Sequence, residues 1–476
     1  MQTIEALEKI SRELDPNEKQ RTAILQKAID YINQYLNALP EYPGYGYGSF
    51  EKLSSMRIEE NAKPVEAILN VLETEVDSTG ISSASGRHLG FIPGGGLWAS
   101  SVADMLGDVS NKYAGIAFSG PGSVKIEKQV IQWMTNIIGY PSNAYGNLTS
   151  GGSIANLIAI KAARDFHGID STNVRKAVIY CGEQTHHSVY KALHITGLHE
   201  AVLRKISLTD RFRIDTHQLE QQIKDDKASG LDPFIVVASA GTTDTGAVDP
   251  LNKIADICAA HKTWFHVDAA YGGFFVLIDE MKEKLKGIER SDSVVLDPHK
   301  TLFLPFGSGA VLLRDKNILL ASNSSKASYL ADTEGLEDIS PADTGIELTR
   351  PNRGIRMWLP LQLHGVAAFK ACLQEKILLS HYFYEQIGKL GFETGPQPDL
   401  TVSIFRYPGD EDNSINQQLI HSIHQDGRVF LSSTTIGGKL WLRCAVVSHR
   451  THLGEMKLAL QMIAENIKKI VPAASK

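Results

Sequence analysis

The chain has 476 residues and a formal net charge of −6, with charges of both signs spread along its length. It contains no basic block that would favour binding to nucleic acid or to a membrane surface. Its 21% charged and 43% hydrophobic residues are typical of a globular protein, and its length indicates more than one domain. The four cysteines lie far apart without a CxxC pair, so we expect neither disulfide bonds nor a metal site.

The N-terminal segment has helical periodicity from about residue 1 to residue 39. Its apolar stripe consists of Leu25, Ala28, Ile29, Ile32 and Leu36. The stretch EYPGYGYGSF that follows contains Pro and Gly and predicts a loop. The charged start differs from the apolar core of a secretory signal, and no run approaches the length of a membrane span. We therefore expect a cytoplasmic protein.

The middle of the chain alternates between β-branched runs and helical patterns. This alternation predicts an α/β domain with a largely parallel sheet. We expect strands at residues 176–181, 234–239, 264–268, 293–297 and 309–313, and helices at 153–166 and 250–261.

A different pattern follows the long helical stretch at residues 355–387. Strand patterns at 400–408, 428–435 and 439–447 precede a final helix at 454–470. They predict a smaller α+β domain at the C-terminal end.

One lysine, Lys300, lies in the stretch SVVLDPHKTLFLPFGSGAVLLRD, which otherwise has the pattern of buried strands joined by an apolar bend. Burying an ammonium group is costly, and lysines are usually exposed. The exception is a lysine used for its chemistry, because desolvation favours the neutral amine that forms Schiff bases.

A possible phosphate site precedes the helix expected at 153–166. The stretch LTSGGSIANL places Gly152 and Ser153 at the helix start, where free N–H groups and the helix dipole attract an anion. Gly and Ser are also ordinary residues at a helix start, so a purely structural role is the alternative.

Further polar residues follow two of the expected strands. His186 and His187 come after the strand that ends at Cys181; a histidine can stack on a flat heteroaromatic ligand, or it can be a simple loop residue. Asp268 ends an otherwise largely apolar strand, where a protonated pyridine nitrogen is a suitable partner and the small Ala270 leaves room for a ring. The alternative for Asp268 is a helix N-cap.

Together these features describe one cofactor. A carbonyl-trapping lysine, a carboxylate for a pyridinium, a stacking histidine and a phosphate-binding helix start are the binding elements of pyridoxal 5'-phosphate. The sequence therefore predicts a pyridoxal-phosphate enzyme.

The motifs DPHK, HVDAAYGG and TSGGSIAN resemble those of the pyridoxal-phosphate-dependent group II amino-acid decarboxylases, which include aromatic-L-amino-acid decarboxylase and glutamate decarboxylase. The resemblance covers nearly the whole chain. It implies the aspartate-aminotransferase fold (fold type I), an α/β fold with a mostly parallel seven-stranded sheet in a large domain and a smaller α+β domain. The implied division is an N-terminal helical segment at 1–85, a large cofactor domain at 86–357 and a small domain at 358–476.

The resemblance also implies roles for single residues. Lys300 would hold the cofactor covalently, Asp268 would pair with its pyridine nitrogen, and His186 would stack on the ring, so that these three form the catalytic set. The remaining cofactor contacts would be Ala270, Gly152, Ser153, Thr242 and His299.

The activity implied is decarboxylation of an L-amino acid to the amine and carbon dioxide. The enzyme would be an obligate homodimer with interlocking N-terminal helices and active sites at the interface. The segments GFIPGGG and YAGIAFSGPG align with the substrate pocket of aromatic decarboxylases, and their apolar character favours an aromatic or other apolar substrate, although a core role is the alternative. The substrate-binding residues would be Phe91, Ile92, Ile116, Phe118 and Arg353, with Arg443 beside the site.

Two departures from the family pattern leave alternatives open. The family's catalytic loop carries a tyrosine that protonates the carbanion; Pro341 aligns with it, and Tyr329 is the nearest tyrosine. Loss of this tyrosine in plant members accompanies aldehyde formation, so an aldehyde synthase remains an alternative. So do a transaminase, a decarboxylase of an acidic or diamino acid, and a non-enzymatic scaffold.

The second departure is Asp297, which stands where the family commonly has Asn. A carboxylate facing the phosphate would be repelled. We therefore expect Asp297 to point elsewhere, toward a backbone N–H.

Overall fold

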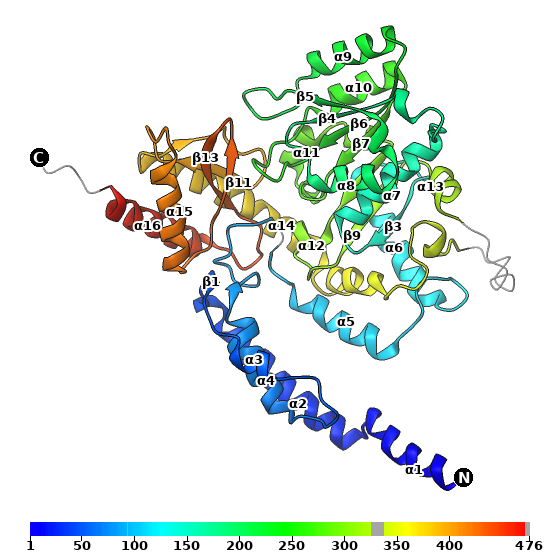
Figure 1. The fold of residues 1–476 in the computed structure, drawn as a ribbon, viewed down its shortest axis with the longest axis vertical. Coiled ribbons are helices and arrows are strands. Elements are labelled where there is room, and N and C mark those ends of the chain that lie inside the picture. Colours follow the sequence, from blue (N-terminus) through cyan, green and yellow to red (C-terminus); the bar gives the residue numbers. More distant parts are fainter. Residues whose placement is uncertain (93, 325–337, 472–476) are drawn as a thin grey trace, which may run out of the picture.

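A seven-stranded sheet forms the centre of the larger part of the computed structural model, which describes residues 1–92, 94–324 and 338–471 (Figure 1). The strand order is β3-β9-β8-β7-β6-β4-β5. β9 pairs antiparallel with both neighbours, and the other four pairings are parallel. The strands are β3 (Tyr145–Thr149), β4 (Ala177–Gly182), β5 (Val202–Ile206), β6 (Asp232–Ser239), β7 (Trp264–Asp268), β8 (Ser293–Leu296) and β9 (Gly309–Leu313). The predicted fold class is confirmed.

Helices cover both faces of this sheet, because strand side chains alternate between the faces. Val311 and Leu313 of β9 join one core with residues of α7, α8 and α13, whereas Ala310 and Leu312 join a second core with α6, α9, α10 and α11. These helices are α6 (Pro121–Ile138), α7 (Gly152–Phe166), α8 (His187–Ile195), α9 (Thr216–Ala228), α10 (Leu251–His261), α11 (Asp279–Leu285) and α13 (Lys316–Asn323).

The sequence patterns predict five of the seven strands to within about two residues and miss β3 and β5. β5 lies at the sheet edge with a burial pattern that exposes Leu203 and Lys205. β3 contains Gly146 and Asn147, residue types that are uncommon in strands.

The smaller part of the body has an antiparallel sheet with the order β10-β11-β13-β12, so the predicted α+β architecture is confirmed. The predicted long helix is α14, which contains a non-helical residue at Gly365 (φ 71°). The proposed boundary between residues 357 and 358 falls inside α14 and stays a prediction. The elements are α14 (Arg353–Lys389), β10 (Glu393–Thr394), β11 (Val402–Arg406), α15 (Ser414–Asp426), β12 (Ser432–Ile436), β13 (Lys439–Ala445) and α16 (Leu453–Ile470).

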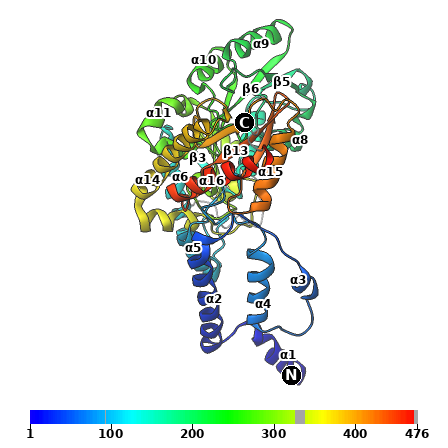
Figure 2. The ribbon, with the colours of Figure 1, turned by 90° about the vertical axis from the view of Figure 1, so that its left-hand side faces the viewer.

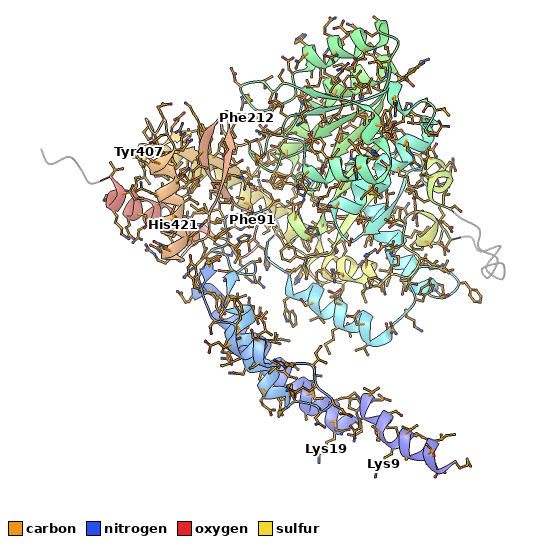
Figure 3. The ribbon with its side chains drawn as sticks, in the orientation of Figure 1. Lys9, Lys19, Phe91, Phe212, Tyr407 and His421 are labelled. Atoms are coloured by element: carbon orange, nitrogen blue, oxygen red, sulfur yellow. The ribbon has the colours of Figure 1, made fainter. Side chains whose placement is uncertain are left out.

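The N-terminal residues form an arm that projects from the body in Figures 1 and 2. Lys9 and Lys19 lie on this arm, away from the body (Figure 3). Its predicted helix divides into two where Pro16 interrupts it. The arm and its base comprise α1 (Gln2–Ser11), η1 (Arg12–Leu14), α2 (Glu18–Ala38), η2 (Leu39–Glu41), β1 (Tyr45–Gly46), α3 (Glu51–Ser55), α4 (Val65–Val71), η3 (Leu72–Asp77) and β2 (Gly80–Ile81).

Short elements complete the body. They are α5 (Trp98–Ser110), η4 (Val174–Lys176), η5 (Leu198–Glu200), η6 (Gly273–Leu277), η7 (Ile288–Arg290), α12 (Pro298–Thr301) and η9 (Pro341–Asp343). Across the described ranges, none of the helices is both long and apolar enough to span a membrane.

Candidate active site

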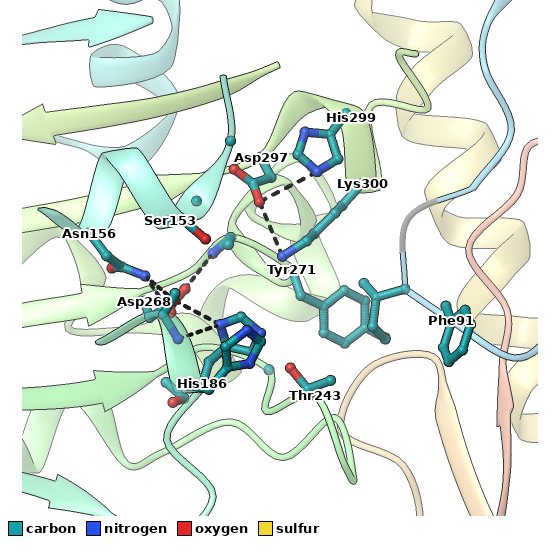
Figure 4. A pocket seen from close by; sticks show the side chains of 18 of the residues that line it. Phe91, Ser153, Asn156, His186, Thr243, Asp268, Tyr271, Asp297, His299 and Lys300 are labelled. Atoms are coloured by element: carbon teal, nitrogen blue, oxygen red, sulfur yellow. Dashed lines mark hydrogen bonds and ion pairs between the residues drawn. The ribbon is translucent and has the colours of Figure 1, made fainter. Parts of the chain in front are cut away.

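A cavity of about 620 Å³ opens at the carboxyl ends of the parallel strands (Figure 4). Its lining includes His186 after β4, Asp268 at the end of β7 and Lys300 after β8. Ligands of open α/β sheets bind at this edge. The predicted site residues that line the cavity are Phe91, Ile92, Gly152, Ser153, His186, Thr242, Asp268, Ala270, His299, Lys300 and Arg443.

The other predicted substrate residues lie away from the cavity lining in the part of the chain described here. Ile116 is buried, and Phe118 is 63% exposed. Arg353 forms an ion pair with Glu347 (2.6 Å) and donates to the main-chain oxygen of Leu148 (3.2 Å). The guanidinium of Arg353 therefore has partners within the protein. A substrate-binding role for Ile116, Phe118 and Arg353 stays a prediction.

Lys300 pairs with a carboxylate inside the cavity. Its Nζ lies 3.1 Å from Oδ2 of Asp297, three residues earlier on the same turn (Figure 4). The expectation that Asp297 points toward a backbone N–H is wrong, because the ammonium group of Lys300 attracts Oδ2 instead. Oδ1 of Asp297 is buried and has no hydrogen-bond partner in the described part of the chain.

His299 lies on the other side of Asp297. Its Nε2 is 3.7 Å from Oδ2 of Asp297, and its Nδ1 is 2.5 Å from the main-chain oxygen of Ser308. Burial lowers the pKa of His299, although the neighbouring Asp297 charge opposes this effect. Lys300 and His299 thus both lie beside one carboxylate at this end of the cavity.

Asp268 is held in place by two donors. Oδ2 accepts a hydrogen bond from Nδ2 of Asn156 (3.0 Å), and Oδ1 accepts one from the backbone N–H of Ala270 (3.2 Å). The side chain is 8% exposed, and it lines the cavity. A carboxylate in this position can neutralise a cationic ring nitrogen of a ligand.

His186 is the N-cap of α8, and its Nδ1 lies 2.7 Å from Oγ of Ser188. Burial lowers the pKa of His186, with the charge of Asp268 acting in the opposite direction. The ring is therefore predominantly neutral at pH 7, which suits stacking on a flat ligand.

The start of α7 lies at one end of the cavity, where the sequence predicts the phosphate site. A Cβ built on Gly152 would lie 2.9 Å from Oδ2 of Asp297 and 3.3 Å from Cβ of Ala270, so a larger residue here would crowd both side chains. First-turn N–H groups of a helix have no intrahelical partners and can bind an anion. The donor set, the side chains of Lys300 and His299 and the cavity volume together fit pyridoxal 5'-phosphate.

Several lining residues were missed by sequence reasoning: Asn156, Gln184, Thr243, Tyr271 and Phe306. Asn156 had a usable signal, since it lies within the largely apolar run IANLIAI, where a buried Asn needs a hydrogen-bond partner. The others lie in loops or turns whose course depends on the fold.

Arg443 joins the two parts of the body at the edge of the cavity. Its guanidinium donates to the main-chain oxygens of Thr243, Asp244 (2.9 Å) and Gly90 (3.3 Å), and to Oγ of Ser432 (2.7 Å). Burial lowers its pKa. Four of its five N–H donors are thus engaged by the protein.

Of the two positions discussed for the catalytic loop, Tyr329 and Pro341, the structure describes only Pro341. Tyr329 lies outside the described residues. Pro341 is buried in η9, where its main-chain oxygen accepts a hydrogen bond from Asn147 (2.8 Å), and it is not among the cavity-lining residues described.

The fold and this site define a pyridoxal-phosphate-dependent enzyme. Residues 48–407 match the pyridoxal-dependent decarboxylase conserved domain. The chain belongs to this family and is a pyridoxal-phosphate-dependent amino-acid decarboxylase, a carboxy-lyase, as its resemblance in sequence predicts.

Similar proteins cover almost the whole chain. Aromatic-L-amino-acid decarboxylase from Bacillus atrophaeus is 32% identical over 464 residues, which are 94% of this chain and 96% of that protein. Phenylacetaldehyde synthase from Arabidopsis thaliana is 25% identical, covering 92% of this chain and 94% of that protein. The crystal structure of Oryza sativa TDC with PLP and tryptamine has a TM-score of 0.89, with 23% identity over 96% of this chain and 99% of that chain.

Replacing Lys300 tests the predicted covalent attachment. We expect Lys300→Ala to remove the visible absorbance of the bound cofactor and to lower decarboxylation by at least about 10³-fold, because the nucleophilic amine is lost. Absorbance spectra and carbon dioxide release measure these effects. Lys457→Ala, at an exposed position of α16, is the control; an unchanged spectrum in Lys300→Ala would refute the assignment.

Protonation of His266 should destabilise the fold in acid. Burial lowers its pKa from 6.5 to about 4, so between these pH values the unfolded chain binds a proton that the folded chain does not. The free energy of unfolding should therefore fall by up to about 3 kcal/mol as the pH drops from 6.5 to 4. Urea denaturation at several pH values in this range gives the free energy of unfolding as a function of pH. This free energy should change less with pH in His266→Gln than in wild type or in the exposed control His217→Gln. An equal pH dependence in all three proteins would contradict the prediction.

Proposed function

We propose that this decarboxylase acts on an L-amino acid with an aromatic or other apolar side chain and releases the amine and carbon dioxide. The observation that carries the proposal is the chemistry of the cavity lining. Phe91, Ile92 and Phe306 supply apolar surface beside the polar residues at the strand ends. Such a surface favours an apolar substrate side chain.

The cations of the described lining argue against an acidic side chain. Among the described residues that line the cavity, Lys300 is the one lysine and Arg443 is the one arginine. Lys300 pairs with Asp297, and Arg443 donates to four protein oxygens. A second substrate carboxylate would therefore find no guanidinium with two free N–H groups for a bidentate pair among the described lining residues.

Similar proteins support the same substrate class. The relative from Bacillus atrophaeus carries the name aromatic-L-amino-acid decarboxylase at 32% identity. Because the relative from Arabidopsis thaliana carries the name phenylacetaldehyde synthase, an aldehyde product is the second candidate.

We assign the chemistry to the residues as follows. When bound, pyridoxal phosphate accepts the electron pair that loss of carbon dioxide leaves on the α carbon. Asp268 keeps a negative charge at the ring-nitrogen end, and His186 covers one face of the ring. The amine of Lys300 provides the covalent anchor and can carry a proton at Nζ. Gly152 and Ser153 hold the phosphate at the start of α7.

A substrate panel tests this proposal. Tyrosine, phenylalanine, tryptophan, dihydroxyphenylalanine, glutamate, aspartate and diamino acids are each incubated with the holoenzyme, and amine, carbon dioxide, aldehyde, ammonia and peroxide are measured. We expect kcat/KM at least about tenfold higher for an aromatic substrate than for glutamate, since unpaired charges are costly in this cavity. Amine and carbon dioxide should form in equal amounts.

The same panel identifies the competing functions. Faster turnover of glutamate, aspartate or a diamino acid would reject the aromatic assignment. Aldehyde, ammonia and peroxide formed in step with carbon dioxide would identify an aldehyde synthase, and amino-group transfer without carbon dioxide a transaminase.

We also propose that the protein is a homodimer with its active sites at the interface. One side of α2 packs on the arm itself through contacts from Lys27 to Glu66 and from Gln34 to Glu73. The opposite side exposes its apolar stripe, with Leu25, Ile29 and Ile32 each at least 40% exposed. Exposed apolar surfaces of this kind mark protein interfaces.

A second exposed apolar surface lies on α5. Trp98, Met105, Leu106 and Val109 are all at least 50% exposed. Phe118 is exposed and lies away from its own cavity, which agrees with a role at the cavity of a second protomer. The arm of one protomer would cover such surfaces of the other.

Introducing charged residues on the apolar stripe of α2 tests whether the protein is a dimer. Replacing both Leu25 and Ile29 with Glu should weaken self-association by at least about a hundredfold, because the interface would bury unpaired carboxylates. Sedimentation velocity measures the oligomeric state, and Asn37→Glu, an exposed polar position on α2, is the control. A wild-type monomer, or a double variant that stays dimeric, would contradict the proposal.

A further inference from the structure

A continuous chain of buried hydrogen bonds runs beneath the cavity from Trp264 of β7 to the start of α8. Nε1 of Trp264 lies 2.9 Å from Oγ of Ser293, which lies 2.8 Å from Nδ1 of His266. Nε2 of His266 then lies 2.8 Å from Oδ1 of Asn156. These four side chains are almost completely buried, so water cannot substitute for any of the bonds.

The chain divides at Asn156, whose amide nitrogen reaches two residues (Figure 4). Nδ2 of Asn156 lies 3.0 Å from Oδ2 of Asp268 and 3.0 Å from Oγ of Ser188. Oγ of Ser188 lies 2.7 Å from Nδ1 of His186. One side chain therefore links the predicted pyridinium partner to the predicted stacking histidine.

The direction of every bond follows from the two ends. The indole of Trp264 can only donate, so Oγ of Ser293 accepts from it. Because Nε2 of His266 faces the amide oxygen of Asn156, Nδ1 of the neutral ring accepts the proton of Ser293. The remaining proton of His266 is on Nε2 and is donated to Oδ1 of Asn156.

The other end requires the same orientation of the amide. The carboxylate of Asp268 can only accept, so Nδ2 of Asn156 must face it. The second proton of Nδ2 goes to Oγ of Ser188, which in turn donates to Nδ1 of His186. The backbone N–H of Ser188 also donates to this Nδ1 (3.3 Å).

We propose that Asn156 is a positioning residue that, through Ser188, locks His186 in its neutral Nε2–H tautomer and so presents an N–H donor to the cavity. Nδ1 of His186 already accepts two hydrogen bonds, whereas Nε2 makes none within the described ranges. His186 therefore enters the reaction as a hydrogen-bond donor at Nε2 and not as a base there.

The chain is a lock and not a proton wire. The amide of Asn156 holds its protons under working conditions, so no proton passes between Asp268 and His186 through it. Asp268 thereby keeps its negative charge while sharing a single orienting residue with His186. The inference concerns the cofactor site and does not depend on the class of substrate.

Nuclear magnetic resonance of histidine tests the tautomer directly. Full-length protein with ¹⁵N-labelled histidine is recorded at neutral pH, and His186 is identified by the signal lost in His186→Gln. We expect the Nε2–H tautomer in wild type and a mixture containing Nδ1–H in both Ser188→Ala and Asn156→Leu. An Nδ1–H tautomer in wild type, or an unchanged tautomer in Ser188→Ala, would overturn the inference.

Kinetics of Ser188 variants separate positioning from a general structural effect. We expect kcat to fall at least about tenfold in Ser188→Ala with KM changed less than about twofold, because the donor orientation matters most during the reaction. Ser188→Thr keeps the hydroxyl and should restore kcat to within about threefold. Ser171→Ala, in an exposed turn, is the control.

The outcomes of this second experiment are distinct. An unchanged kcat in Ser188→Ala, or equal losses in the Ala and Thr variants, would reject the positioning role. The resonance experiment needs no substrate, so an incorrect substrate assignment cannot produce its result.

Discussion

Parallel strands end at a common edge of a sheet, and the active site depends on this constraint. The register aligns Ser239 of β6 with Asp268 of β7, and Asp268 with Val295 of β8. The ends of these strands and the loops after them therefore bring Thr242, Asp268 and Lys300 to one cavity, although helical connections separate them in the sequence. The strand β9 pairs antiparallel with β8, so its amino end lies at the edge of the sheet where the parallel strands have their carboxyl ends.

Alternation along β7 places its polar side chains on one face. Phe265 and Val267 enter the core that contains α6 and α10, whereas Trp264 belongs to the core on the α7 side. His266 and Asp268 both contact Asn156 of α7, as the two-residue period of a strand requires. The same period therefore explains how a largely apolar strand provides a buried polar network without interrupting the opposite core.

The sequence predicts most of the large sheet and the cofactor residues, because both have strong local signals. Strands with β-branched runs are recognised, whereas β5 at the sheet edge is not. All eight predicted cofactor residues line one cavity, since their motifs follow strand ends. Asp297 was expected to turn to a backbone N–H, but it pairs with Lys300, a contact that depends on the turn α12 (Pro298–Thr301).

The sequence by itself determined the family, the cofactor and five of the seven strands of the large sheet, because each of these is encoded in short motifs or in hydrophobic periodicity. Only the tertiary structure decided that Asn156 joins Asp268 to Ser188, and that Arg443 donates to three main-chain oxygens and to Oγ of Ser432. It also placed Ile116, Phe118 and Arg353 away from the described cavity lining. Such contacts join residues far apart in the chain, and their partners are set by packing rather than by any local pattern.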